Sequence, residues 1–300
     1  GDHRHLHSFP TRRSSDLEMQ RKIAGESYLD ILKSGGGIHA TVAAVRAADE
    51  ETLYALASRR MEQMLQHGTT TVEIKTGYGL DAESEYKLLR VINRLQRDQK
   101  ADVVATFLGA HIVPKDKPRG EYIDWLCAEA AALRPYAHFY DVFCEKEAFT
   151  FEETVKLLEA ARAAGFRLKI HAGQFSKLGA AAMAADLGAV SADHCDHLAD
   201  QELEHMRRNG TIAVLLPGAS FFTGSSTYPD ARKLIQRGVA VAVATDFNPG
   251  SCPCFSMQMM VALACLKLKM TAAEAITAAT INAAWRSEEH TSELQSPNTI

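Results

Sequence analysis

Short apolar segments alternate with amphipathic segments along most of the chain. From residue 69 onward, seven segments rich in Val, Ile and Ala each precede a segment with apolar residues at helical spacing. We expect strands at residues 69–75, 103–108, 139–144, 167–170, 189–192, 211–216 and 239–245. No hairpin signal such as Asn-Gly joins one strand directly to the next. Strict alternation of strand and helix predicts a parallel sheet.

The helices that follow these strands are expected at residues 82–97, 119–133, 151–164, 177–187, 200–208 and 230–237. Two more are expected at 255–269 and 272–284, the second capped by Thr271. Ahead of the first strand, residues 40–66 carry apolar positions at helical spacing. Residues 27–32 read as a short helical piece that Gly35-Gly36-Gly37 closes.

Seven strand–helix units are one fewer than a closed (β/α)8 barrel contains. The missing strand would precede residue 18. An open doubly wound sheet is the competing fold, but no Gly-x-Gly-x-x-Gly follows the first strand. Ionisable residues recur at the C-terminal ends of the strands, where the active sites of barrels lie. We therefore predict an α/β protein, a (β/α)8 TIM barrel whose first strand is missing or replaced.

The two ends of the chain differ from everything between them. Residues 1–17 and 286–300 are polar and show no periodicity. Both resemble translated sequencing-adaptor read-through, and we interpret them as foreign tails around a barrel domain at 18–285. Ordinary disordered tails are the alternative interpretation.

The composition of the chain argues against a nucleic-acid-binding protein and against a membrane-spanning protein. The chain has 300 residues, a formal net charge of -4 and 46% hydrophobic residues, which is typical of a soluble globular protein. This balance provides no basic face for nucleic acid, and no run of eighteen apolar residues predicts a membrane span. The six cysteines are scattered and the N-terminus lacks a signal-peptide core, so we expect free thiols and a cytoplasmic location.

The most informative stretch is the apolar segment at 239–244, which runs through Thr245 into Asp246 and then into the turn residues Pro249-Gly250. A carboxylate at the end of a buried strand is costly unless it meets a metal or another cation. An Asp that caps the next turn is the simpler alternative for an isolated residue. Here other expected strands end in His111, His171 and His194.

Imidazole and carboxylate groups together select divalent metals such as zinc or iron. His171 and Asp246 are the candidate ligands. His194 is a candidate for moving a proton or polarising a carbonyl, and His111 for binding substrate. Glu145 also ends a strand, but its residue type alone assigns it no role. The remaining histidines between residues 39 and 205 take a structural interpretation: His39, His67, His138, His197 and His205.

Several motifs together resemble the imidazolonepropionases of the amidohydrolase superfamily. The similarity spans residues 18–285 and rests on Gly35-Gly36-Gly37-Ile38, Lys75-Thr76-Gly77-Tyr78-Gly79-Leu80, Leu108-Gly109-Ala110-His111, Asp141-Val142-Phe143-Cys144-Glu145, Ile170-His171-Ala172, Ala192-Asp193-His194, Leu215-Leu216-Pro217-Gly218-Ala219 and Thr245-Asp246-Phe247-Asn248-Pro249-Gly250-Ser251. The resemblance implies a metal-dependent TIM barrel. It also implies a reaction in histidine degradation, the opening of 4-imidazolone-5-propanoate to N-formimidoyl-L-glutamate.

The resemblance also implies roles by position. His171 and Asp246 would bind the metal, and His194 would lie beside the metal-bound water. Asp246 would act as general base and then as general acid. The residues that would contact substrate or product are Tyr78, His111, Gln174, Asn248, Gly250 and Ser251. Tyr28 matches a family position as well, and Gln174 stands where some members have Glu.

One departure from the family pattern concerns the first barrel strand. In the family this strand ends in His-x-His, which supplies two metal ligands, and an Arg that binds substrate follows. His5-Leu6-His7 has this spacing, but matching residues 18–25 to the family places the pair on Leu6 and Ser8. A shift of one residue turns the side chains of a strand to its other face, so we interpret His5 and His7 as coincidence. The family's β-sandwich is absent too.

Three functional hypotheses follow. The first is an imidazolonepropionase that acts on a small-molecule substrate, for which a homodimer is an open expectation. The second is another amidohydrolase, such as a cyclic-amidine deaminase, which should differ at Tyr78 and at Asn248-Pro249-Gly250. The third is not an enzyme but an incomplete barrel or a metal-poor binding module.

Overall fold

Seven parallel strands form one sheet, and each strand pairs with the next strand along the chain. The computed structural model describes residues 20–21, 24–26 and 37–287. The strands are β1 (Thr71–Lys75), β2 (Asp102–Ala110), β3 (Phe139–Cys144), β4 (Arg167–Ala172), β5 (Ser191–His194), β6 (Ile212–Leu215) and β7 (Val241–Val243). The sheet order is β1-β2-β3-β4-β5-β6-β7. A doubly wound sheet reverses its strand order at a switch point, so that alternative is wrong.

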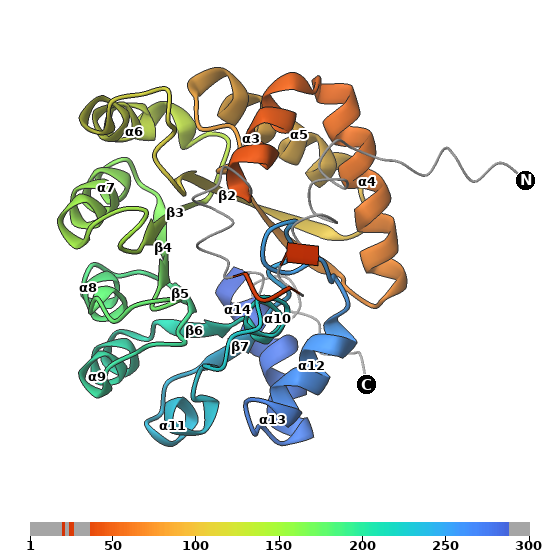
Figure 1. Cartoon of the computed structure of the whole chain (residues 1–300), viewed down its shortest axis with the longest axis vertical. Coiled ribbons are helices and arrows are strands. Elements are labelled where there is room, and N and C mark those ends of the chain that lie inside the picture. The colour runs from red at the N-terminus through yellow and green to blue at the C-terminus, as the bar shows by residue number, and fades with distance from the viewer. Residues whose placement is uncertain (1–19, 22–23, 27–36, 288–300) are drawn as a thin grey trace, which may run out of the picture.

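Helices cover the outer face of this curled sheet (Figure 1). Those between strands are α5 (Ala82–Asp98), α6 (Arg119–Leu133), α7 (Phe151–Ala163), α8 (Ala180–Asp186), α9 (Asp200–Asn209), α10 (Pro217–Phe222) and α11 (Ala231–Gln236). Two helices precede β1, α3 (Ile38–Ala47) and α4 (Glu50–Gln66). Three follow β7, namely α12 (Met257–Leu266), α13 (Ala272–Ala279) and α14 (Ile281–Ser287).

The sheet curves into most of a barrel but does not close within the part of the chain that the structure describes. β1 and β7 are its two edges, and no described strand pairs with the outer side of either. β1 is half-buried along its whole length, whereas every residue of β5 and β6 is buried. The expected barrel lacking one strand agrees with this arrangement.

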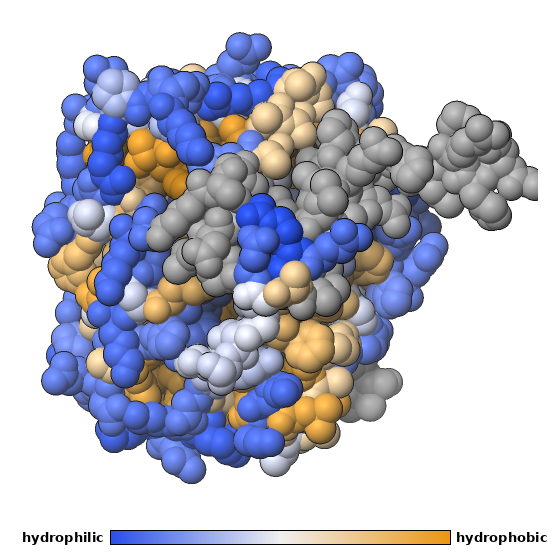
Figure 2. All heavy atoms as spheres, viewed as in Figure 1, coloured by the Kyte–Doolittle hydropathy of each residue, from blue (hydrophilic) through white to orange (hydrophobic). Residues whose placement is uncertain are grey.

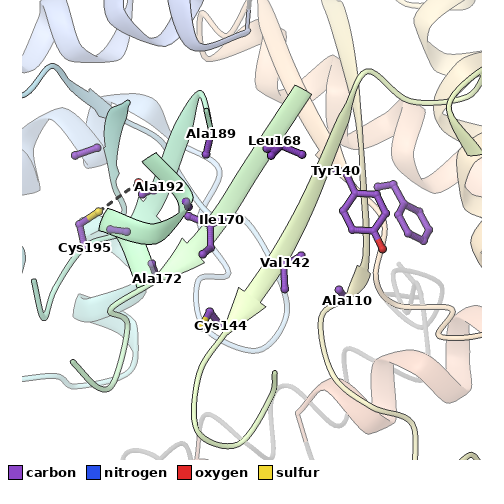
Figure 3. Packing of buried hydrophobic residues seen from close by; sticks show 14 of the residues in the cluster. Ala110, Tyr140, Val142, Cys144, Leu168, Ile170, Ala172, Ala189, Ala192 and Cys195 are labelled. Atoms are coloured by element: carbon purple, nitrogen blue, oxygen red, sulfur yellow. Dashed lines mark hydrogen bonds between the residues drawn. The ribbon is translucent and has the colours of Figure 1, made fainter. Parts of the chain in front are cut away.

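The core lies between the sheet and its helices. Side chains alternate between the two faces of a strand, and Leu168, Ile170 and Ala172 of β4 belong to the apolar cluster drawn in Figure 3. In the same cluster the Tyr140 ring packs 5.2 Å from Phe107 and 5.5 Å from Phe166, between ring centroids. The intervening positions of β4 are therefore free to face the barrel interior.

Several element boundaries differ from the expected ones. Residues 40–66 form two helices because the Asp49 side chain accepts the N–H of Thr52 and starts α4. The expected helix at 272–284 is divided into α13 and α14 at Thr280, whose backbone leaves the helical conformation. α10 was not predicted, and β7 is shorter than its apolar segment. The cap by Thr271 is confirmed.

Three sequence predictions concern residues at the ends of the chain. Residues 1–17 and the helical piece at 27–32 lie outside the described residues. Of the tail expected at 286–300, residues 286 and 287 end α14, and the remainder lies outside the described residues. All six cysteines are free thiols, as predicted. None of the helices in the described ranges has both the length and the apolar character to cross a membrane.

Candidate active site

A cavity of about 1860 Å³ opens at the C-terminal ends of the strands and extends toward the gap between β1 and β7. Its lining includes every predicted site residue that the structure describes: Tyr78, His111, His171, Gln174, His194, Asp246, Asn248, Gly250 and Ser251. Tyr28 lies outside the described residues. The candidate residues that are far apart in the sequence thus lie on one cavity.

Three histidines at the ends of β2, β4 and β5 meet at this cavity. The ring centroids of His171 and His194 are 5.3 Å apart, and those of His111 and His171 are 6.4 Å apart. Tyr78 packs edge-on against His111 at 5.2 Å. Burial lowers the pKa of His111 to about 4 and holds the pKa of His194 well below its ordinary value. Both rings are therefore neutral at neutral pH and can accept or donate a single hydrogen bond at each nitrogen.

His171 is oriented by a carboxylate on the adjacent strand. Its Nδ1 lies 3.1 Å from Oδ1 of Asp141, which is fully buried in β3. A carboxylate only accepts, so Nδ1 carries a proton, and in the neutral ring Nε2 then has the lone pair. Metal-binding histidines commonly have such a carboxylate partner. This geometry fits the predicted ligand role of His171.

Charged residues in the barrel interior were missed by the sequence prediction. Lys75 Nζ lies 2.5 Å from both Asp141 Oδ2 and Asp193 Oδ2, and Lys169 Nζ lies 2.8 Å from Glu73 Oε1. Burial opposes the charge on Lys75, but the two aspartates outweigh it and raise the lysine pKa. The available signal was the alternation in Glu73-Ile74-Lys75 and Lys169-Ile170-His171, which places both charges of each triplet on one face.

Asp141, His171 and Asp193 offer ligand atoms within 4.8 Å of one another. The Lys75 ammonium is hydrogen-bonded to both of these carboxylates. A lysine cation thus already compensates the two negative charges. We therefore assign the two aspartates to the charge network, and of these three residues only His171 stays a metal-ligand candidate, beside Asp246.

Asp246 begins a compact turn after β7. It has a left-handed backbone with φ of 50°, and Ser251 Oγ donates to its Oδ2 at 3.1 Å. Burial raises the pKa of Asp246, although His171 and Ser251 oppose this. The amide of Asn248 donates to the Asp246 carbonyl at 2.6 Å and accepts the N–H groups of Gly250 and Ser251 at 2.9 and 2.7 Å. The N–H groups of Gly250 and Ser251, two residues expected to contact substrate or product, are thus hydrogen-bonded within the turn in this structure.

Glu145 receives a role from the structure. Its Oε2 accepts the N–H groups of Phe175 and Ser176 at 3.0 and 3.1 Å, and the Ser176 hydroxyl donates to its Oε1. This carboxylate therefore fixes the loop after β4, which carries Gln174.

Glu85 does the same for the loop after β1. Fully buried at the start of α5, its carboxylate accepts the N–H groups of Gly77, Gly79 and Leu80 at 2.8–3.2 Å. The loop needs glycine at 77, because φ is +95° and a Cβ would lie 2.3 Å from the Leu108 carbonyl oxygen. Its carbonyl at 77 also faces His111 Nδ1 at 3.1 Å. Glu85 thereby places Tyr78 and His111 beside each other.

Comparison with known proteins agrees with this site. The model of the Amidohydrolase family matches residues 11–293. Imidazolonepropionase from Caldanaerobacter subterraneus subsp. tengcongensis is 45% identical over 94% of this chain and 68% of its own length. Imidazolonepropionase from Geobacillus thermodenitrificans is 47% identical over 90% of this chain and 65% of its own length. The chain spans about two thirds of the length of these curated relatives.

Solved structures share the fold at low sequence identity. Adenine deaminase from Arthrobacter aurescens aligns with a TM-score of 0.64 at 14% identity, over 93% of this chain and 89% of that one. Guanine deaminase from C. acetobutylicum aligns with a TM-score of 0.60 at 16% identity, over 80% of this chain and 63% of that one. The fold, the strand-end histidines and the sequence relatives lead to the same conclusion. The chain belongs to the amidohydrolase family, among its imidazolonepropionases.

Proposed function

We propose that this active site hydrolyses the cyclic amide C–N bond of 4-imidazolone-5-propanoate and releases N-formimidoyl-L-glutamate. The observation that carries the proposal is the convergence of His111, His171, His194 and Asp246 on one cavity. Support comes from curated imidazolonepropionases that are 44–47% identical over at least 90% of the chain.

A divalent metal, zinc or iron, fits the donor set. His171 Nε2 and the Asp246 carboxylate would hold it, and Asp141 already occupies His171 Nδ1. Catalytic zinc sites generally have three protein ligands, so these two residues form part of a complete set. When bound, such a metal lowers the pKa of water to about 7 and makes it nucleophilic.

The remaining steps use side chains of this chain. Asp246 accepts a proton from the attacking water and gives it to the ring nitrogen that leaves. His194 is neutral and donates one N–H to the oxygen that becomes negative. His111 and Tyr78, whose rings pack edge to face, contact the ring of the substrate. The turn at 248–251 binds the propionate only if Asn248 releases the N–H groups that it accepts.

The test is turnover by metal-loaded protein that includes the family's His-x-His strand. It should hydrolyse imidazolone propanoate and leave cytosine and guanine unchanged. Asp246→Asn should lower kcat by about 10²–10⁴-fold, the usual contribution of general acid–base catalysis. Asp124→Asn on the exposed face of α6 is the matched control. Equal turnover of a nucleobase would favour the deaminase hypothesis instead.

A further inference from the structure

An arginine on α3 reaches the end of the loop that follows β1. Arg46 Nε donates to the Gly79 carbonyl at 2.7 Å, and Nη2 donates to the Leu80 carbonyl at 3.2 Å. The guanidinium group also pairs with Asp81 and Asp116, at 2.8 and 3.0 Å. The planar fork of N–H groups thus binds two successive carbonyls of the loop, which a single ammonium group could not do in the same way.

The backbone of Arg46 is itself fixed by α5. Lys87 of α5 donates from Nζ to the carbonyls of Val45, Arg46 and Ala48, at 2.7–3.1 Å. These carbonyls lie at the C-terminal end of α3, where backbone acceptors have no partner within the helix. α3 is therefore held against α5, and the arginine side chain extends to the loop from a fixed position.

The peptide group between Gly79 and Leu80 is held at both ends. Its N–H donates to Glu85 Oε1 at 2.9 Å, and its carbonyl accepts from Arg46 Nε. Leu80 has a φ of 56°, a left-handed conformation that is unfavourable for a residue with a Cβ. A flip of this peptide would turn ψ of Gly79 and φ of Leu80 by about half a turn and bring Leu80 to an extended backbone. It would also break both hydrogen bonds, so the two charged side chains together oppose the flip.

We propose that Arg46 is a positioning residue of the active site, which prevents this flip and so keeps the loop that carries Tyr78 in one conformation. In that conformation the Tyr78 ring packs edge-on against His111 at the cavity. The contact of Tyr78 with substrate rests on the proposed function. The hold on the peptide does not, because it follows from hydrogen bonds within this chain. Failure of one can thus be separated from failure of the other.

A second arginine provides a matched control. Arg90 of α5 donates from Nε to Glu50 of α4 at 2.6 Å, and both side chains are exposed. In the part of the chain that the structure describes, this hydrogen-bonded ion pair joins α5 to α4 and lies outside the loop after β1. Arg90→Met therefore removes an arginine that connects two helices and leaves the loop carbonyls with their donors.

The experiment observes single amides of this loop in the metal-free 300-residue chain. Gly79-Leu80 is the only Gly-Leu pair in the sequence, and Tyr78-Gly79 is the only Tyr-Gly pair. Glycine labelled with ¹³C at the carbonyl and leucine labelled with ¹⁵N therefore give one carbonyl–amide correlation, that of the Leu80 N–H. The corresponding labels in tyrosine and glycine select the Gly79 N–H.

Hydrogen exchange at the Leu80 N–H should be about tenfold or more faster in Arg46→Met than in the wild type, the usual effect of losing a hydrogen bond to a charged group. The rate should be unchanged in Arg90→Met. The Gly79 N–H is the internal reference, because it donates to Glu85 at 2.8 Å but belongs to the preceding peptide. The flip should accelerate exchange at Leu80 more than at Gly79, whereas a general loss of stability accelerates both by the same factor.

Two further measurements complete the test. The ring signals of Tyr78, assigned from those lost in Tyr78→Phe, should shift or broaden in Arg46→Met and stay unchanged in Arg90→Met. The three-bond coupling between the amide and Hα protons of Leu80 depends on φ, and in the wild type it should have the value of a left-handed residue. This coupling is measured without any variant, so it applies even where Arg46→Met does not fold.

Four results would overturn the proposal. The first is a folded Arg46→Met protein with the wild-type exchange rate at Leu80, and the second is equal acceleration at Leu80 and Gly79. The third is a set of Tyr78 ring signals that Arg46→Met leaves unchanged. The fourth is a wild-type coupling typical of an extended backbone at Leu80. Far-UV circular dichroism and the urea midpoint show which variants are folded.

Discussion

Two buried glutamates use their carboxylates to hold backbone rather than to bind a ligand. Glu85 accepts N–H groups from the loop that carries Tyr78, and Glu145 accepts N–H groups from the loop that carries Gln174. Loops at the strand ends of barrels carry function but are the least constrained part of the fold. At the residue scale, the site is therefore built from side chains that contact substrate and others that fix the backbone beneath them.

Glu85→Gln should loosen the loop after β1. Its amide NH₂ would face the N–H of Gly77, which would lose its 3.1 Å hydrogen bond to Oε2 and keep only the 3.2 Å contact with Oε1. The loss of one such hydrogen bond costs about 0.5–1.5 kcal/mol. We expect a lower urea midpoint and faster hydrogen exchange at the Gly77 amide. Glu83→Gln, exposed in the same first turn of α5, should change neither. Equal exchange rates in the two variants would contradict the role given to Glu85.

At the scale of the element, α13 shows how a short helix is anchored to a neighbour. Thr271 and Glu274 form a capping box, with the Thr271 N–H donating to Glu274 Oε2 at 2.8 Å. Oε1 of the same glutamate pairs with Arg232 of α11 at 2.6 Å. One carboxylate thus starts α13 and joins it to another helix.

This arrangement makes a pH-dependent contribution to stability. The Arg232 and Thr271 contacts lower the pKa of Glu274 to about 2. A depressed carboxyl pKa stabilises the folded state above the unfolded-state pKa, about 4.3 for a glutamate, and this contribution is lost as the pH falls through the folded-state value. The urea midpoint of the wild type should exceed that of Glu274→Gln at pH 6, and the difference should shrink between about pH 4.3 and 2. A constant difference over that range would contradict this account.

The helices and strands were predictable because the spacing of apolar residues along the sequence indicates which face of each element is buried. Buried parallel strands are apolar runs, and the surrounding helices are amphipathic. The strand-end positions of His111, His171, His194 and Asp246 followed from the same pattern. The break between α3 and α4 at Asp49 did not follow from this pattern. Apolar residues continue at helical spacing across it, and only the hydrogen bond from the Thr52 N–H to the Asp49 side chain starts a new helix there.

The charge network of the barrel interior could not be located from the sequence. Lys75 meets Asp141 from 66 residues away and Asp193 from 118 residues away. Only the curvature of the sheet brings these strands face to face. The motifs that contain these residues were recognised, but their mutual contacts depend on the radius and stagger of the barrel.

At the scale of the whole molecule, the strands that the structure describes leave one side of the barrel open, between β1 and β7. The cavity is lined on that side by β1, the turn after β7 and α14. Exposed apolar side chains lie on the three last helices, Leu266 on α12, Ile276 on α13, and Ile281 and Trp285 on α14. Apolar surface is visible where α12 and α13 lie in Figure 2. Unpaired strand edges and exposed apolar side chains both favour association with other chains.

We expect this 300-residue chain to bind metal poorly and to be nearly inactive. His171 and Asp246 are two ligands, whereas catalytic zinc typically has three from the protein. The measurement is metal content and turnover beside a version whose first strand carries His-x-His. Stoichiometric metal and comparable turnover in the chain as it stands would show that His5 and His7, or other residues near the N-terminus, complete the site.

The identity of sheet order and chain order has a consequence for biosynthesis. Each strand from β2 to β7 pairs with the strand before it in the chain, and that partner has already been synthesised when the later strand leaves the ribosome. The sheet can therefore assemble in the direction of translation. Lys75 is synthesised first, and its ammonium group must remain solvated until Asp141 and then Asp193 have been synthesised and can form ion pairs with it. The turn at Asp246 is synthesised after all seven strands. A nascent chain can thus complete its scaffold before it acquires its proposed catalytic carboxylate.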